Sequence, residues 1–97
     1  MKRARIDNNQ KEIVSALRRA GAGVLSIADK GNGAPDIVVG FRGENYFIEI
    51  KNPNTSYGKK GAQENQKAFA LTWPGKTPQV AYSIADCFKI LNINQKP

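Results

Sequence analysis

The sequence has 97 residues, which suits one domain with a modest core, and we expect residues 1–97 to form that single domain. It contains 15 lysines and arginines but only 8 aspartates and glutamates, and the net charge of +7 favours a polyanionic partner. With no histidine and one cysteine, Ser-His-Asp and Cys-His triads and His-ligated zinc are excluded, so hydrolysis would have to rest on carboxylates, lysine, tyrosine and an oxygen-bound metal.

The N-terminal half predicts one helix followed by three strands. Apolar residues recur at helical spacing over residues 7–20, and Gly21 and Gly23 are expected to end this helix. The strands and the segments that join them are then expected at 23–28 (strand), 29–34 (glycine-rich loop), 36–41 (strand), 42–45 (hairpin turn) and 46–51 (strand).

The C-terminal half predicts a helix, a short strand and a last helix. A loop at 52–61 leads into a helix at 62–72, and a strand is expected at 78–82. Ser83 begins the last helix, which runs to Leu91, with an aspartate three residues after the serine as in a capping box. The order α-β-β-β-α-β-α indicates an α/β fold.

The strand at 46–51 places charged side chains within an otherwise apolar segment. Side chains alternate along a strand, so Glu49 and Lys51 share one face, while Ile48 and Ile50 share the other, which we expect to face the core. The hairpin turn pairs this strand with the one before it and brings Asp36 close to Glu49 and Lys51. Two carboxylates and one ammonium are therefore expected on one surface of the sheet.

Two interpretations of this cluster remain open from the residues alone. Neighbouring carboxylates repel unless a divalent cation lies between them, and Mg²⁺ held there would bind a phosphate and activate a water, with Lys51 offsetting the charge of the transition state. The alternative is a surface salt bridge between Glu49 and Lys51, with Asp36 capping a turn or strand. A Glu-x-Lys tripeptide by itself favours the alternative.

The start of the first helix carries polar residues on its apolar face. Continuing this face toward the N-terminus reaches Gln10 and then Asp7. Either the helix frays into water, with Asp7 as its N-cap, or this end of the helix lines a polar site.

The motif from Gly33 to Gly40 (GAPDIVVG), followed by Tyr46 to Lys51 (YFIEIK), resembles the signature of PD-(D/E)xK nucleases. With Asp7 to Gln10 before the first helix and Glu64-Asn65-Gln66 opening the second, residues 3–91 resemble stand-alone virus-type replication-repair nuclease (VRR-NUC) domains. The resemblance implies a restriction-endonuclease-like core, α-β-β-β-α-β with a C-terminal helix and a mixed sheet.

The resemblance also implies roles for particular residues. Asp36, Glu49 and the backbone carbonyl of Ile50 would bind Mg²⁺, or Mn²⁺ in its place, and Lys51 would be the catalytic lysine. Further catalytic positions of the family match Gln66, Gln10 and Asp7. Many relatives carry a glutamate near Asp7, so the identity of any further acidic residue stays open, with Glu12 as the other candidate.

The implied activity is a DNA endonuclease selective for branched structures, similar to Holliday-junction resolvases. A flap or nicking nuclease and a non-catalytic DNA-binding module are the alternatives. No helix resembles a base-reading element, so we expect DNA contacts to be made to phosphates. The expected contact residues, each of which could instead be a solvated charge, are Lys2, Arg3, Arg5, Lys30, Lys59 and Lys60.

A homodimer and a cytoplasmic location are expected as well. A short chain has a marginal core, a four-way junction has two-fold symmetry, and Phe41, Phe69 and Trp73 are large apolar residues near element ends. No apolar stretch approaches the ~20 residues of a membrane span, and no apolar segment follows the basic N-terminus as in a signal peptide. The single thiol, Cys87, is expected to be buried and inert.

Overall fold

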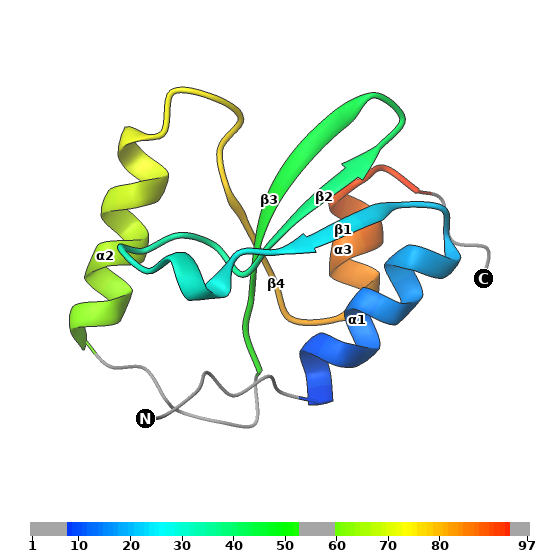
Figure 1. Cartoon of the computed structure of the whole chain (residues 1–97), viewed down its shortest axis with the longest axis horizontal. Coiled ribbons are helices and arrows are strands. Elements are labelled where there is room, and N and C mark those ends of the chain that lie inside the picture. The colour runs from blue at the N-terminus through cyan, green and yellow to red at the C-terminus, as the bar shows by residue number, and fades with distance from the viewer. Residues whose placement is uncertain (1–7, 53–59, 94–97) are drawn as a thin grey trace.

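The computed structural model describes residues 8–52 and 60–93 and has the predicted order of elements (Figure 1). In chain order the elements are α1 (Asn8–Arg19), β1 (Gly23–Ser26), the 3-10 helix η1 (Ala28–Lys30), β2 (Ile37–Phe41), β3 (Glu44–Ile50), α2 (Lys60–Thr72), β4 (Gln79–Ala81) and α3 (Ile84–Ile90). The α/β class predicted from the sequence is confirmed.

The four strands form one mixed sheet in the order β1-β2-β3-β4. β1, β2 and β3 are antiparallel, and β4 lies parallel to β3. The turn between β2 and β3 has only two residues, Arg42 and Gly43, with φ values of 52° and 82°. Positive φ at both positions is what a tight hairpin requires, so the four-residue turn predicted at 42–45 is two residues too long.

The hydrophobic core lies between one face of the sheet and the helices α1 and α3, which pack side by side (Figure 1). Ile13 of α1 and Cys87 of α3 are fully buried there against Ile37 and Ile48 of the sheet. The prediction that the isoleucine face of β3 points to the core is confirmed, as is the burial of Cys87. Burial, followed by the nearby Asp86, raises the pKa of this thiol to about 11, which keeps it protonated and unreactive.

Several element boundaries differ from those predicted. β1 ends at Ser26 rather than at residue 28, and η1 follows where a loop was expected, while α2 begins at Lys60 rather than at residue 62. The N-cap of α3 is as predicted, since the N–H of Asp86 donates to Ser83 Oγ at 3.1 Å. The carboxylate of Asp86 accepts from the N–H of Tyr82, so the reciprocal bond is displaced by one residue from a capping box.

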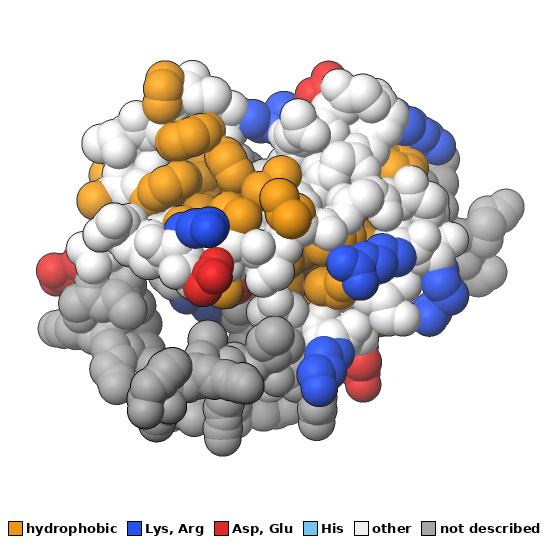
Figure 2. Space-filling view, viewed as in Figure 1, with side chains coloured by type: hydrophobic (Ala, Val, Ile, Leu, Met, Phe, Trp, Pro, Cys, Tyr) orange, Lys and Arg blue, Asp and Glu red, His pale blue; other side chains and the backbone are white. Residues whose placement is uncertain are grey.

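α2 lies on the opposite side of the sheet from α1 and α3. The side chains of Glu49 and Lys51 point toward α2. On the face shown in Figure 2, apolar side chains gather over α2 and the strands beside it, whereas lysines and arginines are spread over the face, several of them on the α1 side. None of the helices described has the length and hydrophobicity that crossing a membrane would require.

Candidate active site

The register of the β2–β3 hairpin places Asp36 next to the end of β3. Ile37 pairs with Ile48, so Asp36, one residue before β2, falls beside Glu49 and Ile50. The backbone N–H of Ile50 donates to Asp36 Oδ2 at 2.7 Å. This bond fixes the direction of one carboxylate of the cluster.

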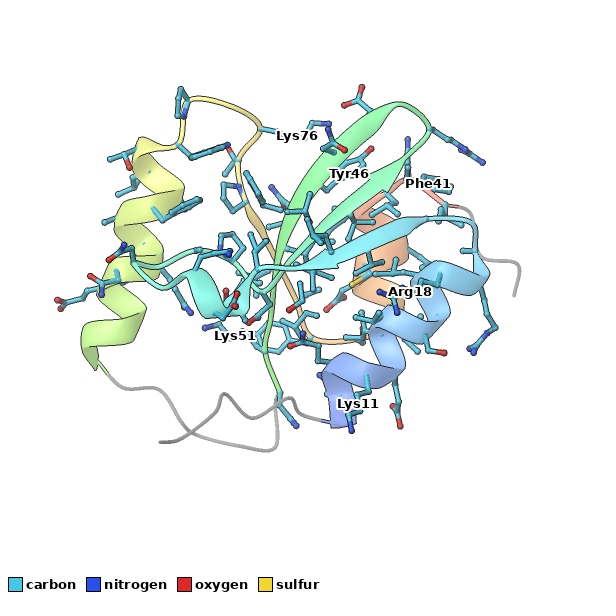
Figure 3. The ribbon with its side chains drawn as sticks, in the orientation of Figure 1. Lys11, Arg18, Phe41, Tyr46, Lys51 and Lys76 are labelled. Carbon is cyan, nitrogen blue, oxygen red and sulfur yellow. The ribbon has the colours of Figure 1, made fainter. Side chains whose placement is uncertain are left out.

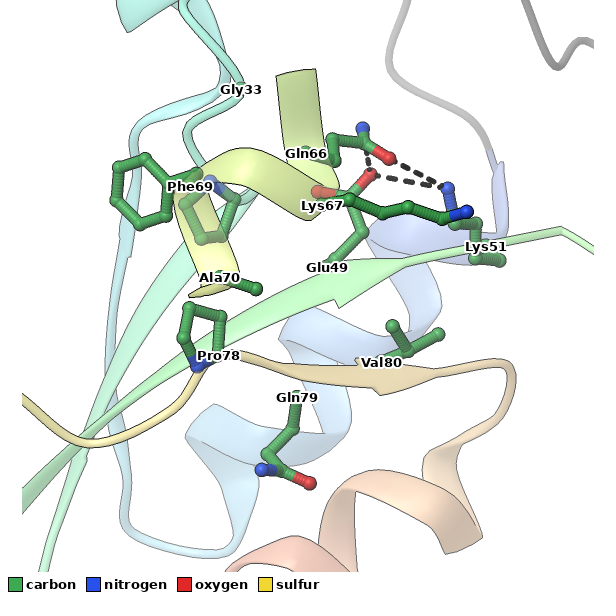
Figure 4. Close-up of a pocket in the computed structure, with 11 residues that line it drawn as sticks. Gly33, Glu49, Lys51, Gln66, Lys67, Phe69, Ala70, Pro78, Gln79 and Val80 are labelled. Carbon is green, nitrogen blue, oxygen red and sulfur yellow. Dashed lines mark hydrogen bonds and ion pairs between the residues drawn. The ribbon is translucent and has the colours of Figure 1, made fainter. Parts of the chain in front are cut away.

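Glu49 and Lys51 are joined through a residue of α2. Gln66 Nε2 donates to Glu49 Oε2 at 2.7 Å, and Lys51 Nζ donates to Gln66 Oε1 at 3.0 Å (Figure 4). Because a carboxylate only accepts and an ammonium only donates, the two partners fix the orientation of the amide. The sequence singled out Gln66 only through the resemblance, and the structure brings it into contact with both residues of β3.

The cluster is a partly buried network. Lys51 Nζ and Glu49 Oε2 lie 3.7 Å apart, so the salt bridge of the alternative interpretation does form. The Glu49 side chain is only 13% exposed, however, and its oxygen is shared with Gln66. Burial, followed by repulsion from Asp36, raises the pKa of Glu49 to about 7, and the Lys51 ammonium and the Gln66 amide only partly offset this.

The donor set fits a hard divalent cation. Asp36 and Glu49 supply carboxylate oxygens, the ligands that Mg²⁺ and Mn²⁺ prefer, and a cation between them would relieve the repulsion that raises the pKa of Glu49. Among the described residues, no three His, Cys, Asp or Glu side chains gather at one point. The remaining ligands would therefore be the Ile50 carbonyl, water or Asp7, which lies outside the described residues.

Aromatic packing holds α2 against the sheet beside this network. Phe69 and Trp73 of α2 stack with ring centroids 5.1 Å apart, and both rings meet the edge or face of Phe47, which shares a face of β3 with Glu49. The centroid of Phe47 is 6.1 Å from that of Phe69 and 5.0 Å from that of Trp73. These contacts position Gln66 one turn away on the same helix.

The first helix approaches the site through a residue that sequence reasoning did not select. Asn9 Nδ2 donates to the backbone oxygen of Lys51 at 3.1 Å, whereas Gln10 lines a groove of about 540 Å³ along α1. Lys11, Arg18 and other polar residues continue this groove, and Figure 3 shows both cations on α1. Their seven-residue spacing places them on one helix face, and this signal could have been read from the sequence.

Several predicted residues are not placed at the network. Lys30 is exposed on η1, and Glu12 is exposed on α1. Lys60 opens α2, but its side chain is not among those described. The remaining predicted residues outside the described part of the chain are Lys2, Arg3, Arg5, Asp7 and Lys59.

Comparison with known proteins finds a similar solved structure. No protein-family model and no curated protein matches the sequence. Among solved structures, a chain described as a VRR_NUC domain is 26% identical, superposes with a TM-score of 0.58, and is matched over 86% of this chain and 89% of its own length. The chain therefore has the fold of a VRR-NUC domain. The fold class and the resemblance to VRR-NUC domains expected from the sequence are thus confirmed, and this likeness supports a nuclease domain.

Proposed function

We propose that this VRR-NUC domain is a Mg²⁺-dependent endonuclease that cleaves DNA phosphodiester bonds at branched structures, as Holliday-junction resolvases do. The observation that carries the proposal is the linked set at the end of β3: Asp36 is held by the N–H of Ile50, and Glu49 is joined to Lys51 through Gln66. Two adjacent carboxylates with a tethered ammonium are what phosphodiester hydrolysis without histidine requires.

Each residue of the site has its own role in this proposal. Bound Mg²⁺, with Mn²⁺ as a substitute, would supply a Lewis acid for the phosphate and lower the pKa of a water molecule. Asp36 and Glu49 would hold the cation. Lys51, kept in place by Gln66, sets a positive charge where negative charge builds on the phosphate oxygens.

Charge supports DNA as the substrate. The chain carries a net charge of +7, and the groove along α1 is lined by Lys11, Arg18 and Arg19 with no carboxylate among its lining residues. In the described part of the chain, salt bridges join only Lys51 to Glu49 and Lys76 to Glu44. Within that part, the three cations of the groove therefore form no salt bridge. They are suited to a phosphate backbone, which carries no sequence information.

Two alternatives differ from this proposal in what they predict. A flap or nicking nuclease would use the same residues on a different DNA shape. A non-catalytic DNA-binding module would need the basic groove only, and the linked set of Asp36, Glu49, Lys51 and Gln66 would have no task in it. The intact set therefore favours catalysis.

The deciding experiment is to incubate the purified protein with four-way junction, flap, nicked and linear duplex DNA, with and without Mg²⁺. We expect Mg²⁺-dependent cleavage of the junction in preference to linear duplex. Asp36→Asn and Glu49→Gln should abolish cleavage but leave DNA binding nearly intact, and Lys51→Ala should slow cleavage by orders of magnitude.

Glu44→Gln is the matched control, because Glu44 is an exposed carboxylate of the same strand that pairs with Lys76 away from the network. It should cut at the wild-type rate. Preferential cutting of flaps would favour the first alternative, and binding without any cleavage would favour the second. Wild-type rates in Asp36→Asn or Glu49→Gln would refute the site.

A further inference from the structure

An apolar slot opens directly beside the catalytic network. Its volume is about 310 Å³, and it lies between α2 and the strands β3 and β4. Glu49, Lys51 and Gln66 form one end of it (Figure 4). The rest of the wall of the slot is mainly apolar. Its apolar residues are Pro35, Phe69, Ala70, Pro78 and Val80.

The slot is open to solvent at the edge of the sheet. β4 is an edge strand, and its Val80 pairs in register with Glu49, so the two side chains are neighbours on one face of the sheet. Val80 remains 48% exposed even though it lines a cavity. Together with the other apolar residues of the wall, this exposed valine beside the partly buried Glu49 forms a continuous apolar surface that another group can cover.

We propose that the slot receives the base of an unpaired nucleotide attached to the scissile phosphate. This inference rests on the proposed function. A phosphate held by the cation that Asp36 and Glu49 would bind brings its own nucleoside to the neighbouring wall, because the sugar and base are covalently attached to it. A planar base fits a cavity of about 310 Å³, and apolar and aromatic walls stabilise its faces without reading its edge.

The charges around the slot favour a nucleotide over a second protein chain. Lys67 lines the cavity and is exposed, so it can meet the next phosphate of the strand. A second copy of the chain seated here would bury the exposed Lys67, which forms no salt bridge within the described residues, and burying an unpaired charge is costly. A nucleotide instead presents a base to the apolar wall and a phosphate to the cations.

The proposal gives a physical reason for selectivity toward branched DNA. A base can enter the slot only after it leaves its pair, and unpairing costs least where a base is already mismatched or single-stranded. Flaps and gaps supply such bases directly, and the pairs at a branch point, where stacking is interrupted, open more readily than those of continuous duplex. The domain would thus select DNA by shape without a base-reading helix.

The test combines a slot-filling variant with a base-free substrate. The cleaved bond is first mapped in the preferred branched DNA, and the adjacent nucleotide is then replaced by an abasic residue. We expect kcat/KM of the wild type to fall by about 10-fold or more on the abasic DNA, the typical value of one stacked base. Ala70→Phe should cause a similar loss on normal DNA but no further loss on abasic DNA.

Ala85→Phe on α3 is the matched control, since Ala85 is an exposed helical alanine away from the slot. It should behave as the wild type on both substrates. If Ala70→Phe does not fold, Val80→Trp replaces it, because the exposed Val80 tolerates a larger side chain. The abasic comparison with the wild type needs no variant at all.

The outcomes that overturn the proposal are distinct from one another. Equal cleavage of normal and abasic DNA by the wild type would refute the slot and leave the nuclease function standing. Equal losses in Ala70→Phe on both substrates would show damage to the network rather than loss of a base site. A change in molecular mass in Ala70→Phe would assign the slot to a second copy. A wild type that cuts no DNA would overturn the proposed function and, with it, this inference.

Discussion

The backbone of Gly33 lies directly against the carbonyl group of Asn65, the residue before Gln66 on α2. A Cβ at position 33 would lie 2.2 Å from that oxygen and 3.1 Å from the backbone nitrogen of Gln66. Gly33 also has a φ of +81°, which side chains rarely adopt. The glycine-rich loop therefore sets how closely α2, and with it Gln66, approaches the catalytic strand.

Gly33→Ala should displace α2 and reduce cleavage much more than it reduces DNA binding. The added carbon meets backbone atoms, which cannot move without moving the helix. Gly43→Ala is the control: its φ of +82° carries the same strain, but nothing lies within 4 Å of its added carbon. Equal cleavage rates in the two variants would mean that the close approach of Gly33 to Asn65 has no role in activity.

Gln66→Ala should lower kcat by about 10–100-fold with little change in KM, as is typical when a residue that orients metal ligands is removed. The amide is hydrogen-bonded to both Glu49 and Lys51, so its removal frees these two side chains from their fixed positions. Thr72→Ala, at an exposed polar position of the same helix, serves as the control. A rise in KM at constant kcat would instead assign Gln66 to DNA binding.

The pKa of Glu49 predicts how the metal-free protein responds to pH. The folded protein raises this pKa from 4.5 to about 7, so it binds the proton more tightly than the unfolded chain does. The ionised form is therefore a destabilising contribution that grows between pH 4.5 and 7 and is complete above pH 7.

Glu49→Gln should accordingly raise the free energy of unfolding in EDTA by roughly 1–3 kcal/mol at pH 8 and by little near pH 4. Denaturant unfolding at both pH values measures this. Added Mg²⁺ should stabilise the wild type at pH 8 but not the variant. A variant that is less stable than the wild type at pH 8 would contradict the raised pKa.

The sequence was sufficient to predict how β2 and β3 pair in the hairpin. It predicted the helix α2 but not the position of that helix against the sheet. Alternation along β3 and a short turn fix which residues face Asp36, and the actual two-residue turn retains that relation. Gln66, by contrast, was found through resemblance alone. Its place depends on the contact between Gly33 and α2 and on aromatic packing, which no local pattern encodes.

The same reason explains what was missed. The slot beside Ala70 forms between elements far apart in the sequence, so neither its volume nor its opening at Val80 follows from periodicity. η1 was assigned to a loop because glycine and polar residues surround it. The spacing of Lys11 and Arg18 was readable, but a charged face on one helix usually needs no explanation beyond contact with water.

Lys11→Gln combined with Arg18→Gln should weaken DNA binding and reduce its dependence on salt. For every phosphate that a side chain no longer neutralises, the slope of log affinity against log salt concentration becomes shallower by about one unit. Lys89→Gln on α3 is the control, since Lys89 is exposed outside the groove. The binding isotherms are measured with Glu49→Gln also present, so that the DNA is not cleaved during the measurement. An unchanged salt dependence of the affinity would mean that DNA does not bind in the groove.

The proposed homodimer should have a mass near twice the 10.6 kDa of the chain when measured by light scattering at micromolar concentration. Of the three aromatic residues that suggested it, Phe41 packs against the core and Phe69 stacks inside the α2 cluster, but Trp73 remains 39% exposed. Leu71, two residues earlier in the chain, is 84% exposed. We therefore expect the end of α2 to contribute to the dimer contact.

Leu71→Arg should shift the mass toward that of one chain, because the added charge cannot be buried without a partner. Leu25→Arg is the matched control, as Leu25 is also exposed, at 64%, but lies on β1 at the other edge of the sheet. Resolving a four-way junction needs two symmetric cuts, so the Leu71→Arg monomer should nick one strand without completing the paired cut. A stable monomer that still makes both cuts would refute the dimer and the symmetry argument together.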